Sequence, residues 1–166
     1  MYENLLAKVP TDLWIGGEWR KSSDRSRFDV IDPATENVIT SVASATVDDA
    51  VAAVDAASAA AVEWAAKPPR ERGEILRKAY ELIMADAERL AKLITLENGK
   101  ALSDSRGEVA YSAEYFRWYA EEGVRNIGQV SIAPSSGARI VAQQKPIGVS
   151  CLVTPWNFPA AMATRK

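Results

Sequence analysis

The residues with the clearest capacity for chemistry lie at the end of the chain, in TPWNFPAAMATRK (residues 154–166). A Trp-Asn pair stands there between Pro155 and Pro159, directly after an apolar run, which is typical of the edge of an active site. Asn157 offers a neutral amide, and Arg165 a guanidinium that can bind a carboxylate through two parallel hydrogen bonds. Each also has an ordinary interpretation, as a turn asparagine that bonds local backbone and as a solvated arginine.

The chain contains no histidine and a single cysteine. The lack of histidine excludes Ser-His or Cys-His activation of a nucleophile within these residues and removes the commonest metal ligand, so no metal site is predicted. Any chemistry must use Cys, Asn, Arg, Lys, carboxylates or a cofactor. Cys151 lies inside the apolar run of residues 148–153 and is predicted to be a buried structural residue, not the nucleophile.

Length and composition narrow the class of protein. With 166 residues and 48% hydrophobic residues, the chain can bury a core and corresponds to one domain or the first part of something larger. A net charge of -2 does not indicate the excess of basic residues that nucleic-acid binding requires. No apolar run reaches the roughly 20 residues that a membrane span needs, and the N-terminus lacks a signal-peptide pattern. We therefore expect a cytoplasmic protein with neither a nucleic-acid nor a membrane partner.

The first 45 residues predict a small antiparallel β region. LWIGGEWR (residues 13–20) reads as a hairpin around two glycines, and residues 28–31 and 38–43 flank a turn that contains Asp-Pro and Asn. Trp14 and Trp19 are predicted to pack against a neighbour, not to bind a ligand.

Three helical segments follow. Thr46 and Asp49 resemble a capping box at the start of the first, which ends at Pro68-Pro69. One apolar stripe then runs from Pro69 to the C-cap pattern Asn98-Gly99. A third helix is predicted over residues 101–125, with buried candidates Val109, Phe116 and Tyr119.

The pattern changes after residue 126. Residues 139–145 alternate in character, which predicts an exposed strand, whereas residues 147–153 are nearly all apolar and predict a strand buried in a parallel sheet. A helix start follows at Pro159. Because a parallel strand needs a parallel partner and no later strand follows, the sheet is predicted to be unfinished.

The motifs along the chain, and its last 22 residues above all, resemble those of a known family. KPIGVSCLVTPWNFPAAMATRK resembles the aldehyde dehydrogenase superfamily, and LWIGGEW, IDPATEN and LITLENGKAL match in the same order, so the resemblance covers essentially the whole chain. It implies an α/β fold class, the N-terminal part of an aldehyde dehydrogenase fold. The implied parts are hairpins and helices of the cofactor domain (1–137), an oligomerisation flap strand (138–146) and the start of an incomplete Rossmann-like NAD(P)-binding sheet (147–166).

The resemblance also implies the chemistry. Such enzymes oxidise an aldehyde to its acid with NAD or NADP through a cysteine thioester, and PWNFPAAMATRK is most similar to succinate-semialdehyde dehydrogenases. By motif match, Asn157 is the oxyanion donor and Arg165 binds the substrate's distal carboxylate. The residues matched to the cofactor site are Val153, Thr154, Pro155, Trp156 and Asn157. Nucleophile and general base lie outside this sequence, so the chain is expected to be an inactive fragment by itself.

Two alternatives stay open. One is a non-catalytic oligomerisation or interaction module, and the other is an aldehyde dehydrogenase for a different aldehyde, such as glutarate semialdehyde. The complete protein is expected to be a homo-oligomer, a dimer or tetramer. The choice between NAD and NADP depends on residues beyond Lys166.

Overall fold

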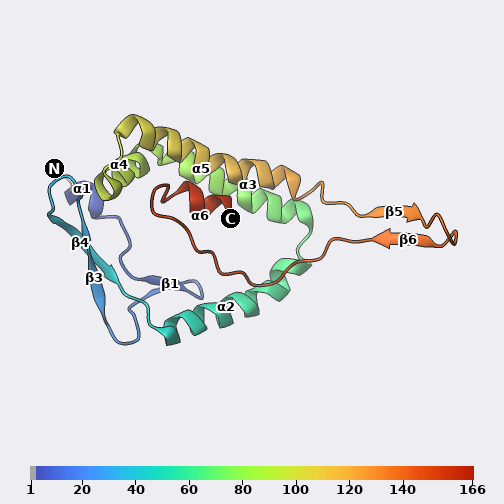
Figure 1. The fold of residues 1–166 in the computed structure, drawn as a ribbon. Helices are drawn as coiled ribbons and strands as arrows, with labels where there is room; N and C mark the ends of the chain where they lie inside the picture. Colours follow the sequence, from blue (N-terminus) through green and yellow to red (C-terminus); the bar gives the residue numbers. More distant parts are fainter. Residues whose placement is uncertain (1–2) are drawn as a thin grey trace.

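The computed structural model describes residues 3–166, and Figure 1 shows two β-hairpins, a group of helices, a projecting hairpin and a short closing helix. None of the helices in this range is long and apolar enough to cross a membrane. In chain order the elements are α1 (Glu3–Leu6), β1 (Leu13–Ile15), β2 (Glu18–Arg20), β3 (Arg27–Ile31), β4 (Val38–Ala43), α2 (Val47–Ala66), α3 (Pro69–Ala85), α4 (Ala87–Asn98), α5 (Leu102–Glu122), β5 (Gln129–Ile132), β6 (Arg139–Ala142) and α6 (Ala161–Arg165).

Both early hairpins are confirmed. β1 pairs with β2 and β3 with β4, each pair antiparallel. Gly16 and Gly17 make the first turn with φ of 65° and 87°, a backbone region that glycine enters without a steric penalty. Trp14 and Trp19 pack against each other, with ring centroids 4.9 Å apart, and each stays more than half exposed.

The predicted capping box opens α2. The Thr46 hydroxyl accepts a hydrogen bond from the Asp49 amide at 3.2 Å, and the Asp49 carboxylate accepts one from the Thr46 amide at 3.0 Å. α2 ends ahead of Pro68, and Pro69 is the first residue of α3, where its missing N–H costs nothing.

The single stripe predicted from Pro69 to Asn98 is two helices. Asp86 departs from helical geometry with φ of -109° and ψ of 13°, so α3 ends before it and α4 begins after it. Its carboxylate accepts from the Arg89 guanidinium at 2.9 Å. Hydrophobic spacing does not indicate this break, because apolar residues continue at helical intervals on both sides of Asp86.

The core lies where α3 and α4 pack against α5. Its buried cluster is made of Ala91, Ile94 and Val109. A Cβ at Gly73 would stand 2.5 Å from the Ala120 carbonyl oxygen, so α3 and α5 approach closely at this point. Burial of Val109 is confirmed, Phe116 is half-buried, and the prediction for Tyr119 is wrong because that residue is 51% exposed.

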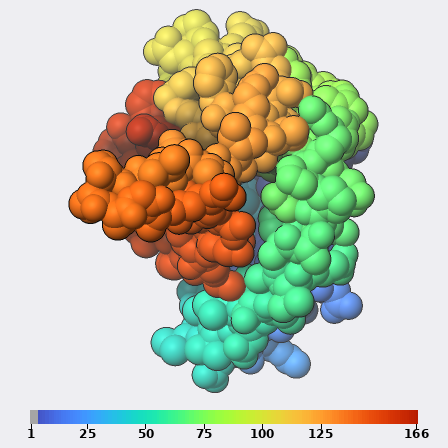
Figure 2. Space-filling view, turned by 90° about the vertical axis from the view of Figure 1, so that its right-hand side faces the viewer, coloured from blue at the N-terminus to red at the C-terminus, as the bar shows by residue number. Residues whose placement is uncertain are grey.

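β5 and β6 form a hairpin that stands away from the helices in Figure 1 and projects toward the viewer in Figure 2. Every residue of both strands is exposed, which confirms an exposed strand here. β6 stops at Ala142, three residues short of the predicted end at Lys145, because its ladder ends opposite Gln129, where β5 begins.

The buried strand predicted at residues 147–153 does not form in this chain. The segment runs past α2 without strand pairing, and Ile147 and Val153 are 95% and 82% exposed. Cys151 is exposed too, so its predicted burial is wrong. The physical reason is that a strand needs a partner to receive its hydrogen bonds, and no other segment among residues 3–166 pairs with this one.

Candidate functional site

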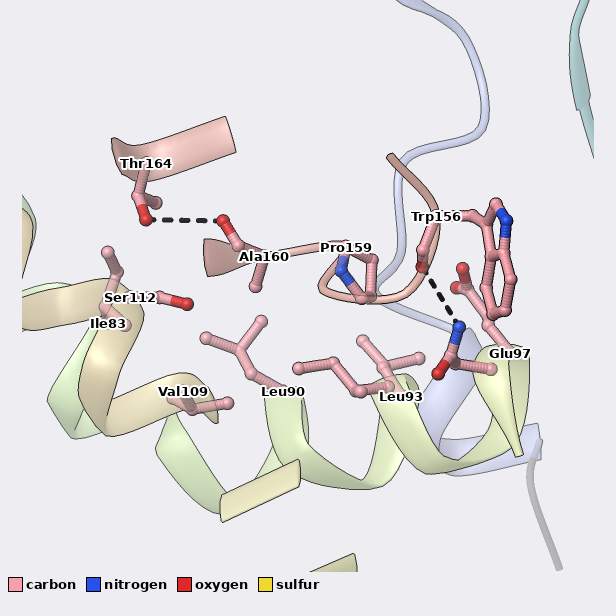
Figure 3. Close-up of a pocket in the computed structure, with 12 residues that line it drawn as sticks. Ile83, Leu90, Leu93, Glu97, Val109, Ser112, Trp156, Pro159, Ala160 and Thr164 are labelled. Carbon is pink, nitrogen blue, oxygen red and sulfur yellow. Dashed lines mark hydrogen bonds between the residues drawn. The ribbon is translucent and has the colours of Figure 1, made fainter. Parts of the chain in front are cut away.

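The turn that carries Asn157 is anchored to the end of α4. The Asn98 side-chain amide donates to the Trp156 carbonyl at 3.1 Å, a bond drawn as a dashed line in Figure 3, and the Lys100 ammonium donates to the Asn157 carbonyl at 2.8 Å. Gly99 lies between these two donors in the left-handed conformation, with φ of 72°, and ends α4. The C-cap therefore directs two side chains at one turn.

Glu108 of α5 ties the same turn to the start of α6. Its Oε1 accepts from the Ala160 and Ala161 amides at 2.9 and 3.2 Å, and its Oε2 pairs with the Lys100 ammonium. The Glu108 side chain is 1% exposed and that of Lys100 14%. Lys100 also lies over the Phe158 ring, 4.0 Å from its centroid, in a cation–π contact. Both charges are thus compensated where water has little access.

A cavity of about 530 Å³ lies beside these anchoring contacts (Figure 3). Its walls come from α3, α4 and α5 on one side and the 156–164 segment on the other. The lining is largely apolar, with Leu90, Leu93 and Pro159 among the side chains in view, and Glu97 and Trp156 lie at one end. Partial desolvation raises the pKa of Glu97.

Tyr111 and Tyr115 of α5 form a hydrogen-bonded pair, and the charge of Arg165 acts on Tyr115. Tyr115 donates its hydroxyl proton to the Tyr111 hydroxyl, and this hydrogen bond raises the pKa of Tyr115. The positive charge of Arg165 acts in the opposite sense on the same group. Arg165 is the last residue of α6 and is exposed, so its guanidinium remains available to an anion.

The site residues predicted from the sequence fall on one continuous exposed strip. Val153, Thr154, Pro155, Trp156 and Asn157 are all exposed. Asn157 is fixed through its main-chain carbonyl while its side chain stays at the surface. Arg165 follows at the far end of α6, so the structure connects the two predicted side chains through one short helix.

Glu108, Lys100 and Asn98 are the residues that sequence reasoning missed. Asn98 is predicted only as part of a C-cap pattern, and nothing in the sequence marks Lys100 or Glu108 as anchors of this turn. The sequence signal that could have indicated Glu108 is the helical spacing of the buried residues of α5, which include Ser105, Glu108 and Ser112. An apolar stripe could not reveal it, because these three side chains are polar.

The comparisons with known proteins decide the family. The aldehyde dehydrogenase family matches residues 19–166. The chain belongs to this family. Among aldehyde dehydrogenases, it is 53% identical over 129 residues to succinate-semialdehyde dehydrogenase of Paenarthrobacter nicotinovorans, covering 78% of this chain and 29% of the relative. It is 41% identical to the NADP(+)-dependent succinate-semialdehyde dehydrogenase GabD of Escherichia coli K12, covering 92% of this chain and 32% of that protein.

Solved structures agree with the aldehyde dehydrogenase fold. An NADP-dependent enzyme of E. coli superposes with a TM-score of 0.92 at 40% identity, over 98% of this chain and 33% of that one. Betaine aldehyde dehydrogenase of Staphylococcus aureus, in complex with NAD+, gives 0.91 at 30% identity, over 97% of this chain and 33% of that one. The chain therefore spans about a third of the length of the aldehyde dehydrogenases it matches.

Proposed function

We propose that the complete protein containing these residues oxidises succinate semialdehyde to its acid with NAD or NADP. The observation that carries the proposal is the family match over residues 19–166, joined to an Asn157 that is anchored by its main chain and exposed at its side chain. Support for the substrate comes from the two relatives above, both succinate-semialdehyde dehydrogenases at 53% and 41% identity.

Asn157 has the role of oxyanion donor in this proposal. A cysteine thiolate, supplied by a part of the protein outside this sequence, adds to the aldehyde carbon and leaves negative charge on oxygen. The Asn157 amide donates a hydrogen bond to that oxygen without changing its own charge, from a main chain that Lys100 already holds in place.

The strip of residues 153–157 is the proposed edge of the cofactor site. All five residues are exposed, and Trp156 is 78% exposed. The Trp156 and Asn157 carbonyls are already bound by Asn98 and Lys100, so the exposed ring of Trp156 and the remaining backbone groups of the strip are what suit a dinucleotide, which presents planar rings and phosphate oxygens. A bound nicotinamide would supply the hydride acceptor for this oxidation.

Arg165 is the proposed partner of the substrate's distal carboxylate. A guanidinium binds a carboxylate through two parallel hydrogen bonds and stays charged at any working pH. Its place at the end of α6, eight residues after Asn157, puts the two groups at opposite ends of one short segment. A substrate with an aldehyde at one end and a carboxylate at the other matches this arrangement.

The test of the proposal is reduction of NAD and of NADP by the complete polypeptide with succinate semialdehyde, glutarate semialdehyde and butanal. We expect the highest kcat/KM with succinate semialdehyde and no reduction by the 166-residue chain alone. Asn157→Ala should lower kcat about 100- to 1000-fold, the cost of removing one oxyanion donor. Asn126→Ala, an exposed asparagine outside this turn, is the matched control. Undiminished kcat in Asn157→Ala would contradict the proposed role.

We further propose that the complete protein is a homo-oligomer in which the β5–β6 hairpin pairs with a second subunit. What supports this is the full exposure of both strands, four of whose residues are large and apolar: Val130, Ile132, Ile140 and Val141. An exposed apolar edge strand is a ready template for pairing.

A further inference from the structure

We propose that Lys100 and Glu108 form a positioning pair that sets the orientation of Asn157. The inference rests on the proposed function for the catalytic meaning of Asn157, while the pair itself is a property of the structure. Neither residue needs to contact the substrate for this role. Both act through the main chain of residues 157–161.

The pair brackets Asn157 on both sides along the chain. On one side the Lys100 ammonium donates to the carbonyl of Asn157 itself, at 2.8 Å. On the other side the Glu108 carboxylate accepts from Ala160 and Ala161 at 2.9 and 3.2 Å. The ion pair joins the two anchors, so a shift of either residue is transmitted to the other.

Burial makes the arrangement sensitive to the loss of either charge. With 1% and 14% side-chain exposure, neither group can exchange its partner freely for water. Removing one partner of such a pair leaves the other charge uncompensated, which the structure relieves by moving the groups that surround it. Lys100 binds the main-chain carbonyl of Asn157. Such a displacement therefore moves Asn157, whose side-chain amide is the proposed oxyanion donor.

The geometric demand on an oxyanion donor explains why such anchoring matters. A catalytic group must be held to within about 0.5 Å of its productive position, and a misplacement of about 1 Å can cost about 100-fold in rate. Prolines flank the turn at positions 155 and 159, but their fixed φ angles do not set where the turn lies relative to α4 and α5. The Lys100–Glu108 pair supplies the link to α5 and, together with the Asn98 bond to the Trp156 carbonyl, the link to the end of α4.

The first arm of the test uses the 166-residue chain and needs no activity. The variants are Lys100→Met, which removes the ammonium from a similar stem, and Glu108→Gln, which keeps the shape and removes the charge. We expect changed NMR resonances for the Asn157 side-chain amide, and Ala160 and Ala161 amide protons that exchange about tenfold faster with solvent. Lys92→Met is the matched control, since Lys92 makes only an exposed 3.6 Å pair with Glu88.

The second arm measures the complete polypeptide. Lys100→Met should lower kcat about 10- to 100-fold while KM for the aldehyde stays within about twofold, because positioning affects the transition state more than substrate binding. Lys100→Arg keeps a charged donor and should recover part of the loss, whereas Lys92→Met should leave kcat unchanged. A merely structural role would lower the yield of folded protein without this split between kcat and KM.

Two results would overturn the proposal: unchanged Asn157 resonances in both variants, or an unchanged kcat in Lys100→Met. If the unaltered complete polypeptide oxidises no aldehyde, the proposed function fails instead. In that event the Asn157 resonances and the Ala160 and Ala161 exchange rates decide the positioning role alone.

Discussion

Asn157 is held by side chains that precede it by more than fifty residues. Lys100 binds its carbonyl across a sequence separation of 57, and Asn98 binds the preceding carbonyl across 58. Both donors flank Gly99, whose left-handed conformation ends α4 and turns the chain toward α5. At the scale of residues, the proposed donor therefore depends on a helix terminus as much as on its own turn.

Arg165→Ala in the complete polypeptide should raise KM for succinate semialdehyde about 10- to 100-fold, the worth of a lost charged hydrogen bond. The expected change for butanal, which has the same carbon number and no carboxylate, is less than about twofold by the same reasoning. Steady-state kinetics with both aldehydes make the comparison. Arg125→Ala serves as control, because Arg125 makes only exposed pairs at 3.7 and 3.9 Å. Equal losses with both aldehydes would rule out carboxylate recognition.

At the scale of elements, the start of α2 is held by one carboxylate. Asp49 accepts from the Thr46 and Ser23 amides, and these backbone hydrogen bonds lower its pKa from the ordinary 3.8 to about 2. Because the folded-state pKa is depressed, the folded protein binds fewer protons than the unfolded chain between these values. The stabilisation is fully present above about pH 4 and is lost as pH falls through about 2.

We predict that Asp49→Asn reduces the drop in melting temperature between pH 5 and pH 2. The amide cannot titrate, so this part of the acid dependence disappears, and the variant is less stable than the unaltered chain at pH 5. Thermal unfolding followed by circular dichroism at several pH values measures this change in the melting temperature. Asp55→Asn, at an exposed position of the same helix, is the matched control. Parallel curves for the unaltered chain and Asp49→Asn would contradict the assignment.

The close approach of α3 and α5 gives a matched pair of glycine substitutions. In Gly73→Ala the new Cβ would meet the Ala120 carbonyl oxygen at 2.5 Å, so the helices must separate, and we expect a loss of about 1–3 kcal/mol. In Gly107→Ala the Cβ enters open space in α5, and we expect a gain of about 0.5–1 kcal/mol from helix propensity. Urea unfolding measures both. A stabilising Gly73→Ala would show that the two helices separate without cost.

At the scale of the whole molecule, much apolar surface lies outside the core. Ile147 and Val153 are almost fully exposed, and the β5–β6 hairpin is exposed throughout. The chain covers about a third of the length of the relatives it matches, so in the proposed complete protein we expect further segments or a second subunit to cover these surfaces. Large exposed apolar patches otherwise promote association.

We predict that the 166-residue chain associates in a concentration-dependent manner and that Ile140→Lys in β6 weakens this association about tenfold or more. A lysine on an exposed strand opposes pairing with another edge, because its charge must be desolvated. Light scattering during size-exclusion chromatography measures the mass. Val62→Lys, on α2 and 77% exposed in the unaltered chain, controls for the added charge alone. Equal effects of the two variants would exclude the hairpin as the contact.

The sequence by itself determined the features that depend on neighbouring residues. The Gly16-Gly17 hairpin, the Thr46–Asp49 capping box and the Gly99 C-cap were predictable because turn and cap chemistry acts over two to four residues. The order of motifs likewise indicated the aldehyde dehydrogenase family, which the match over residues 19–166 confirms. The break at Asp86 was missed because hydrophobic spacing continues across it.

Only the tertiary structure decided how distant groups meet. It brought Lys100 and Glu108 to the turn at Asn157, and it left residues 147–153 exposed where their apolar character predicted a buried strand. The reason is the same in both cases: burial and pairing are properties of a partner elsewhere in the chain. The sequence around a polar residue does not show which distant residue it will pair with. An apolar segment that finds no strand partner stays exposed to solvent.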